Sequence, residues 1–343
     1  MPKIELKNVY KIFGEEPQSV LPLVQNGATK EEILEETDHT VGLDNVSISI
    51  EEGETFVCMG LSGSGKSTLI RHINRLIDPT EGEVLVDGVN VLEFNESELL
   101  ELRRHEMSMV FQSFGLFPHK TVIQNVAYGL EIQDKPLEER NSTAEEQIKA
   151  VGLNGFEHQY PSQLSGGMQQ RVGLARALAT NPGILLMDEA FSALDPLIRN
   201  DMQDQLVELQ SKLHKTIVFI THDLDESLKL GDHIGILNGG RLVQVGKPEE
   251  IIMNPADDYV AAFVKDVNRA KVLRAKTIML STKHNPLNGR KLGDTHKVHE
   301  NSFIEEFLPQ VLEQRSVVEV VDEDGKTMGF ITEKELAQSL SKN

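Results

Sequence analysis

The sequence predicts an α/β protein built around a parallel β-sheet, followed by a small C-terminal α+β region. Short apolar runs at residues 55–59, 184–187 and 217–220 have the length of buried strands. Segments of helical length separate these runs, and alternating strands and helices are the pattern of a parallel sheet. The 343 residues are enough for about two domains.

Strands near the start of the chain are expected to form an edge of the molecule. Residues 4–10 are interpreted as an opening edge strand, and residues 46–50 alternate apolar and polar side chains. Residues 15–41 look like an insertion that holds a short helix over 30–36. The further expected elements are a helix from Lys66 to about Ile77 stopped by Asp78-Pro79, a hairpin at residues 84–88, a mainly helical stretch over 92–160, a helix over 198–213 and a late hairpin at Asn238-Gly239-Gly240.

Composition and charge exclude several classes of protein. The 34 Lys and Arg residues against 54 Asp and Glu residues give a formal net charge of −20. Such a chain repels phosphate backbones, so nucleic acid is not an expected partner. No apolar run approaches the ~20 residues that span a bilayer, and the charged N-terminus is unlike a signal peptide. The single cysteine, Cys58, lies in an apolar run and is expected to be a buried thiol of a cytoplasmic protein.

A glycine-rich loop follows the first apolar strand. Its sequence, Gly60-Leu61-Ser62-Gly63-Ser64-Gly65-Lys66-Ser67, matches the pattern G-x-x-x-x-G-K-[ST] and leads into a helix that continues with Thr68. Glycines let the backbone wrap closely round phosphates, and the N–H groups at a helix N-terminus attract anions. We expect Lys66 to reach the β- and γ-phosphates of a nucleotide and Ser67 to place its hydroxyl on Mg²⁺.

Two adjacent carboxylates end the second apolar strand. Asp188 and Glu189 follow residues 184–187, which places them at the edge of the sheet where the glycine-rich loop also lies. Asp188 would hold Mg²⁺ and Glu189 would position the attacking water. A strand that ends in Asp-Glu is common and is weak evidence by itself. Together with the glycine-rich loop it predicts a nucleotide-hydrolysing site.

A second anion site is expected at the start of another helix. The string Leu164-Ser165-Gly166-Gly167-Met168-Gln169-Gln170 exposes backbone N–H groups at the positive end of that helix. The alternative is a simple serine N-cap with a soft turn.

In this order and spacing, the motifs resemble those of the ATP-binding-cassette ATPases. Residues 60–67 resemble their Walker A sequence, Asp188-Glu189 their Walker B and residues 164–170 their signature sequence. The resemblance covers about residues 3–268 and implies a P-loop NTPase fold. That fold has a RecA-like parallel sheet core, an antiparallel β edge and a helical subdomain over about 92–170.

The resemblance also gives roles to single residues. Gln112 looks like the Q-loop glutamine, which would also touch the metal, and His222 looks like the switch histidine; with Glu189 they form the implied catalytic set. Ser192-Ala193-Leu194-Asp195 looks like the D-loop. Phe13 stands where the family stacks an aromatic ring on adenine. Each residue has a plainer interpretation when it is taken alone. Gln112 could be a surface amide and His222 a structural histidine. Asp195 could be a helix cap and Phe13 a core residue.

The resemblance further implies that one chain cannot complete its own active site. Ser165 and Gly167 would contact the γ-phosphate bound by a second copy, with Gly166, Gln169 and Asp195 beside them. A head-to-tail homodimer would therefore enclose two ATP molecules. An integral membrane permease would contact residues 112–125, where Phe114, Leu116, Phe117 and Val122 offer apolar anchors. A solute-binding protein or domain outside the cell would take part indirectly. The chain would then lie peripherally on the cytoplasmic face of the membrane.

Finer features resemble the ATPase subunits of quaternary-amine importers, which carry glycine betaine, proline, choline or carnitine. These features are residues 110–119, residues 188–199 and the insertion. The alternatives are an importer of amino acids or other small solutes, a cassette ATPase outside transport, and a regulatory binding protein with an idle ATPase.

Residues 269–297 are interpreted as a basic linker, and residues 317–340 as a ββα unit resembling part of a cystathionine-β-synthase-type (CBS) domain. The expected domains are thus 1–268 and 269–343.

Overall fold

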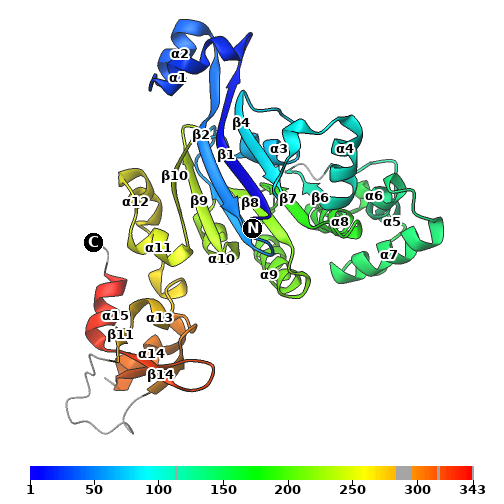
Figure 1. Ribbon diagram of the computed structural model, residues 1–343. Helices are drawn as coiled ribbons and strands as arrows, with labels where there is room; N and C mark the ends of the chain where they lie inside the picture. The colour runs from blue at the N-terminus through cyan, green and yellow to red at the C-terminus, as the bar shows by residue number, and fades with distance from the viewer. Residues whose placement is uncertain (113–114, 193, 283–295, 315–316, 342–343) are drawn as a thin grey trace. The chain divides into compact units, whose positions relative to one another are not determined.

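A computed structural model describes residues 1–112, 115–192, 194–282, 296–314 and 317–341 (Figure 1). The chain divides into two compact units, Met1–Val245 and Gly246–Asn343. The division into domains at residue 268 stays a prediction. No helix in the described ranges is long and apolar enough to cross a membrane.

A six-stranded sheet forms the centre of the first unit, in the order β10-β9-β3-β8-β7-β6. The strand pairs β9–β3, β3–β8, β8–β7 and β7–β6 are all parallel, as the sequence predicts. Asp188 and Cys58 both pair with Ile220, so the carboxyl ends of β3, β7 and β8 lie at one edge. The strands are β3 (Thr55–Met59), β6 (Met107–Val110), β7 (Ile184–Asp188), β8 (Thr216–Thr221), β9 (His233–Asn238) and β10 (Arg241–Gly246).

Three neighbouring helices directly follow β3, β7 and β8 and therefore begin at that same edge, and a fourth precedes β7 (Figure 1). They are α3 (Lys66–Ile73), α8 (Gly166–Ala179), α9 (Pro196–Leu213) and α10 (Leu224–Leu230). The helix α3 is shorter than expected, because Arg75 adopts a left-handed conformation with φ 49° and ends the helix before Asp78-Pro79. The strand β6 was not expected; only four residues long, it stands in the stretch predicted to be mainly helical.

A second, antiparallel sheet has the order β2-β1-β4-β5. Its strands are β1 (Ile4–Phe13), β2 (Thr40–Ile50), β4 (Glu81–Val86) and β5 (Val89–Asn90). The prediction that the first strand is an edge strand is wrong, because β1 pairs with β2 on one side and β4 on the other. One apolar core joins β1, β2 and β4 to α3 and to the parallel sheet, and Cys58 lies in it with no exposed surface. Burial raises the pKa of the Cys58 thiol to about 12.

The insertion over residues 15–41 folds into short helices with a core of its own. These are a 3-10 turn at Pro17–Ser19, α1 (Leu21–Gln25) and α2 (Lys30–Thr37), which confirms the helix expected over 30–36. A capping box between Thr29 and Glu32 begins α2. The apolar cluster beneath the helices contains Tyr10, Ile12, Val20, Leu21, Val24, Ile33 and Val41.

Short helices fill most of residues 91–163. They are a 3-10 turn at Val91–Glu93, α4 (Glu96–Glu101), a π-helical turn at Leu102–Glu106, α5 (Val122–Val126), α6 (Tyr128–Ile132), α7 (Leu137–Ala150) and a 3-10 turn at Pro161–Gln163. Of the core positions expected here, Leu102, Ile148 and Val151 are buried. Leu99 is partly buried against the main core.

The second unit holds a four-stranded sheet in the order β11-β14-β13-β12. The expected ββα unit corresponds to β13 (Val318–Val321), β14 (Thr327–Ile331) and α15 (Glu333–Leu340). Residues 269–281 differ from the expected linker, because Ala270, Leu273 and Ala275 belong to the core of this unit. Lys283, Arg290 and Lys291 lie outside the described residues. The other elements are α11 (Pro248–Met253), α12 (Asp258–Val264), a 3-10 turn at Arg269–Lys271, α13 (Ala275–Ile278), β11 (Leu280–Ser281), β12 (His296–His299) and α14 (Ile304–Gln314).

Candidate active site

The glycine-rich loop runs from the end of β3 to the start of α3. Gly60, Gly63 and Gly65 have φ values of 153°, 76° and 105°. A Cβ atom at Gly60 would stand 2.2 Å from the Leu237 carbonyl oxygen, and one at Gly65 would stand 2.5 Å from the Gly42 carbonyl oxygen. Only glycine fits these two positions, so the close turn of the loop is fixed by sequence. Ser62 is exposed at its tip.

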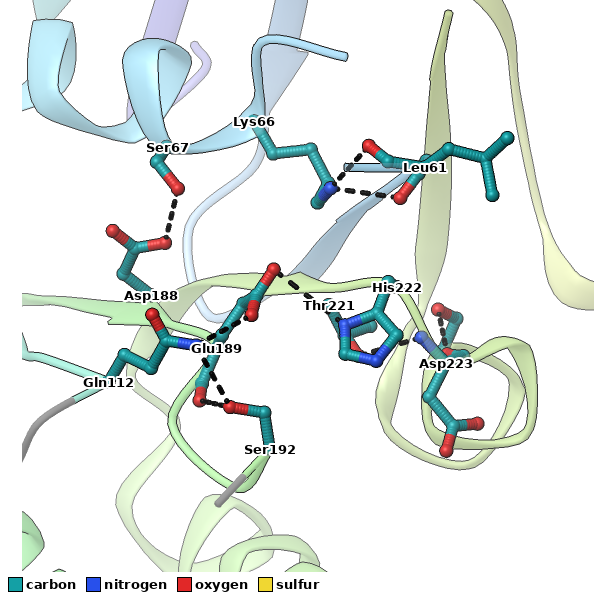
Figure 2. Close-up of polar contacts among 12 residues, drawn as sticks. Leu61, Lys66, Ser67, Gln112, Asp188, Glu189, Ser192, Thr221, His222 and Asp223 are labelled. Carbon is teal, nitrogen blue, oxygen red and sulfur yellow. Dashed lines mark hydrogen bonds and ion pairs between the residues drawn. The ribbon is translucent and has the colours of Figure 1, made fainter. Parts of the chain in front are cut away.

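Two side chains at the end of this loop, those of Lys66 and Ser67, are held by local contacts (Figure 2). Lys66 Nζ donates hydrogen bonds to the carbonyl oxygens of Gly60 (2.8 Å) and Leu61 (2.9 Å), so its ammonium group is held against the backbone at the start of the loop. Ser67 Oγ donates to Asp188 Oδ1 at 2.9 Å. The Oγ atom of Ser64 is buried and makes no hydrogen bond within the described part of the chain.

Asp188 sits in a largely buried position at the end of β7. Burial raises the pKa of its carboxyl group, and the Ser67 hydroxyl and the Arg71 guanidinium, 3.7 Å away, counter part of that rise. A carboxylate so placed is costly to keep ionised without a cation. A cation bound next to Asp188 would therefore stabilise its ionised carboxylate.

Glu189 lies one residue further, between two neighbouring loops. Its backbone is left-handed, with φ 47°, and its N–H donates to the Ile220 carbonyl oxygen at 3.0 Å. Gln112 Nε2 donates to Glu189 Oε2 at 3.0 Å, and His222 Nδ1 lies 3.7 Å from Oε1. Figure 2 shows the three side chains converging from three different segments. Non-glycine residues in this conformation are uncommon, and strain of this kind tends to concentrate at functional sites.

The segment around residue 165 forms a second cluster with its own internal contacts. Ser165 caps α8, where its Oγ accepts from the Met168 N–H at 3.3 Å. Gln169 Nε2 donates to the carbonyl oxygens of Pro161 and Leu164, so its side chain braces its own loop. Space around Gly166 is open, whereas a Cβ atom at Gly167 would stand 2.5 Å from Ile198 Cγ2.

Three predicted residues remain. Phe13 is 40% exposed, with Lys11 Nζ 5.1 Å from its ring centre, so its ring is available for stacking. Asp195 caps α9, where its Oδ1 accepts from the Ile198 N–H at 3.2 Å. Thr68 lies in the first turn of α3, half-buried.

The structure thus brings one group of predicted side chains together. Lys66, Ser67, Gln112, Asp188, Glu189 and His222 gather at the carboxyl edge of the parallel sheet (Figure 2). The contacts of Ser165 and Gln169 given above stay within residues 161–168.

Two residues of the expected permease surface are buried or half-buried. Val122 is fully buried in the core and is not an exposed anchor, because it starts α5 with its side chain turned inward. Phe117 packs on Tyr128, with ring centres 4.5 Å apart, and is half-buried. Phe114 and Ala193 lie outside the described residues.

Sequence reasoning did not single out Arg199. Its guanidinium contacts Asp223, Ser192 and Leu194, close behind Glu189 and His222. The sequence did contain one indication of this role. Arg199 is an arginine in the first turn of an expected helix, just after the cap formed by Asp195-Pro196.

The residues fit a bound magnesium nucleotide. The Ser67 hydroxyl and the Asp188 carboxylate are hard oxygen donors of the kind that Mg²⁺ takes up together with phosphate oxygens and water. In the described ranges no group of three His, Cys, Asp or Glu side chains forms a metal cage.

Comparisons with known proteins give the family. A family model described as "ABC transporter" matches residues 43–192. The glycine betaine/carnitine transport ATP-binding protein GbuA of Listeria monocytogenes is 59% identical over 280 residues, which are 82% of this chain and 70% of that protein. The trimethylamine N-oxide transport system ATP-binding protein TmoW of Pelagibacter ubique is 46% identical over 330 residues, 96% of this chain and 95% of that protein.

Solved structures agree with these relatives. The dimeric structure of MJ0796, described as a bacterial ABC transporter cassette, has a TM-score of 0.61 and 37% identity, and covers 71% of this chain and 98% of that one. The fold and site define a P-loop nucleotide-binding protein of the cassette type. The chain belongs to the ATP-binding subunits of ABC transporters. It binds ATP, and it is an ATPase whose hydrolysis is coupled to transport.

Proposed function

We propose that two copies of this chain hydrolyse ATP to drive the uptake of quaternary amines and related osmoprotectants through a membrane permease. The observation that carries the proposal is the gathering of Lys66, Asp188, Glu189 and His222 at one sheet edge, in a chain 59% identical to a glycine betaine/carnitine transport protein. The solutes in question are glycine betaine, proline, choline or carnitine. An importer of amino acids or other small solutes remains the alternative.

Trimethylamine N-oxide is a second candidate solute. TmoW of Pelagibacter ubique aligns with 96% of this chain, whereas GbuA aligns with 82%. Betaines and trimethylamine N-oxide share a methylated, positively charged nitrogen. The choice between them is made by the proteins that contact the solute, and not by this ATPase.

In the proposed mechanism the loop over residues 60–67 encloses the phosphates of ATP. Its N–H groups and the start of α3 supply positive potential, and Lys66 leaves the carbonyl oxygens of Gly60 and Leu61 to reach the β- and γ-phosphates. Ser67, Asp188 and Gln112 would hold Mg²⁺, which neutralises phosphate charge when bound. Phe13 stacks on the adenine, with Ser62, Ser64 and Thr68 lining the phosphate loop.

Glu189 positions the attacking water. Its carboxylate accepts from Gln112 and lies near the imidazole of His222. The family resemblance assigns to both neighbours the role of sensing the γ-phosphate. Hydrolysis of this kind needs alignment and charge neutralisation more than covalent help. The left-handed backbone at residue 189 sets the direction in which the side chain leaves the chain, and the hydrogen bond from Gln112 holds its carboxylate.

The γ-phosphate requires a second copy of the chain. Ser165 and the glycines at the start of α8 present N–H groups that the loop of the same chain is not expected to use. We propose a head-to-tail homodimer in which residues 165–169 of one copy complete the site of the other, with Asp195 at the seam. ATP closes this dimer because it binds the closed state more tightly than the open one.

The other partners follow from this arrangement. The permease contacts the segment 112–125, without the buried Val122 as an anchor, and a solute-binding protein or domain outside the cell acts through it. The ATPase lies peripherally on the cytoplasmic face of the membrane. The second unit, with its CBS-like ββα part, would regulate transport.

The test is uptake by the chain expressed with its permease. Labelled glycine betaine, choline and trimethylamine N-oxide should be compared with an unrelated amino acid, using Lys66→Ala as the inactive control. Uptake of a methylated amine that the control lacks supports the proposal. Uptake of the amino acid alone would refute the proposal and indicate an importer of amino acids or other small solutes.

A further inference from the structure

A polar interface joins α9 to α10 directly behind the candidate active site. Both helices carry buried apolar side chains, and three polar pairs also link them. Arg199 pairs with Asp223 at 3.4 Å, Gln203 Nε2 donates to Glu226 Oε1 at 3.1 Å, and Lys229 pairs with Asp204 at 2.7 Å. A cleft of about 230 Å³ lies beside them.

The first pair differs from the other two because it also reaches the catalytic loops. Arg199 Nη2 donates to the carbonyl oxygens of Ser192 (3.3 Å) and Leu194 (3.1 Å), in the loop that follows Glu189. Its Nη1 atom donates to Asp223, the residue after His222. One planar guanidinium thus spans the loops after β7 and β8, and its fork geometry fixes their spacing.

Each end of this bridge lies one contact from a catalytic side chain. Ser192 Oγ donates to the Glu189 carbonyl oxygen at 2.9 Å and lies 3.4 Å from Gln112 Nε2. Asp223 begins α10 as its N-cap and is covalently next to His222. The separation between the Glu189 carboxylate and the His222 ring therefore depends on the spacing of the two loops.

We propose that Arg199 is a positioning residue that holds the loop carrying Glu189 in register with the loop carrying His222. The bridge leaves the phosphate loop untouched, so it acts on turnover and not on nucleotide binding. The inference rests on the proposed roles of Glu189 and His222. It adds to them the group that sets their mutual placement.

The test compares Arg199→Ala with Lys229→Met in the full chain reconstituted with its permease. Lys229 belongs to the same helix pair but contacts neither loop in the bonds described, so it controls for general loosening of α9 and α10. We expect Arg199→Ala to lower kcat by about 10- to 100-fold, the size of effect that small misplacements produce, with the ATP Kd unchanged. Lys229→Met should stay within about twofold of the parent kcat.

Two more variants separate positioning from folding. Asp223→Asn keeps a good helix cap but loses the ion pair, so it should lower kcat, and it should add little to Arg199→Ala because both break one bridge. Arg199→Lys keeps the charge without the fork and should recover only part of kcat at a melting temperature near the parent's.

Three results would overturn the inference: a parental kcat for Arg199→Ala, additive effects with Asp223→Asn, or equal losses in Arg199→Ala and Lys229→Met that follow their melting temperatures. Glu189→Gln separates this failure from that of the proposed function. If Glu189→Gln still turns over, the proposed catalytic site fails; if it is inactive while Arg199→Ala is normal, only the bridge fails.

Discussion

Replacing Glu189 by glutamine tests the chemistry of the candidate site with little change of shape. Glutamine has the size of glutamate and can keep the left-handed backbone at this position, with its φ of 47°. It loses the carboxylate that accepts from Gln112 at 3.0 Å and faces His222 Nδ1 at 3.7 Å. The phosphate loop is not contacted in these bonds, so ATP should still bind.

The expected loss follows from the role of the side chain. A group that orients or accepts a proton from the attacking water contributes about 10²- to 10⁴-fold to rate. At about 1.4 kcal/mol per factor of ten, that is roughly 3–5 kcal/mol of barrier. The folding free energy should change by only about 1 kcal/mol, the net worth of one hydrogen bond. Turnover should therefore collapse while the protein remains folded.

Phosphate release under single-turnover conditions measures the chemical step, and size-exclusion chromatography with ATP measures dimer formation. We expect the variant to accumulate as an ATP-bound dimer, because closure continues while hydrolysis stops. Glu208→Gln is the matched control: this exposed glutamate of α9 pairs only with Lys212 in the contacts described and should leave the rate unchanged. A parental rate in Glu189→Gln would remove the residue from the mechanism.

Three further predictions concern other parts of the molecule. Ser165→Arg should lower ATP turnover at least about 100-fold without weakening ATP binding to the monomer, since its target lies across the dimer; normal turnover would contradict the shared site. Because burial raises the pKa of Asp188, the native state releases this proton at a higher pH than the unfolded chain does, so this group costs stability as the pH rises through its native pKa. In the absence of nucleotide and metal, Asp188→Asn should therefore have a higher melting temperature than the parent at pH 7.5, by about 2–4 °C for each kcal/mol of stability gained. This gain should shrink as the pH falls, and a lower melting temperature at pH 7.5 would refute the argument. Deleting residues 269–343 removes the whole apolar core that starts at Ala270, and should change the salt response of transport while basal ATPase activity persists; an unchanged salt response would count against regulation by the tail.

The parallel sheet and the phosphate loop could be predicted from sequence because their signals are local. Residues 184–187 and 217–220 are apolar throughout, and a buried parallel strand needs nothing else. The glycines at 60 and 65 belong to a short contiguous motif that the sequence shows directly, although the contacts that they relieve are with Leu237 and Gly42, which lie elsewhere in the chain. The gathering of Asp188 and Glu189 with the loop follows from strand direction alone.

Features that depend on distant partners could not be predicted in the same way. The strand β6 is four residues long and gains its place from pairing with β7. The central position of β1 depends on β4, which lies some 70 residues further along the chain. Val122 was expected to be a surface anchor because it is an apolar residue within the segment 112–125, and only the packing of α5 shows that it is buried. The bridge by Arg199 joins two loops whose proximity the sequence does not encode locally.

The burial of Cys58 has a practical consequence for experiments on this chain. With no exposed surface and a pKa near 12, the only native sulfhydryl should be inert to maleimides and other alkylating reagents while the protein is folded. The wild-type background can then serve directly for site-directed labelling. A cysteine introduced at Ser62 and another at Ser165 would report, by oxidative crosslinking or by spin-label distances, whether the two loops of separate copies approach each other.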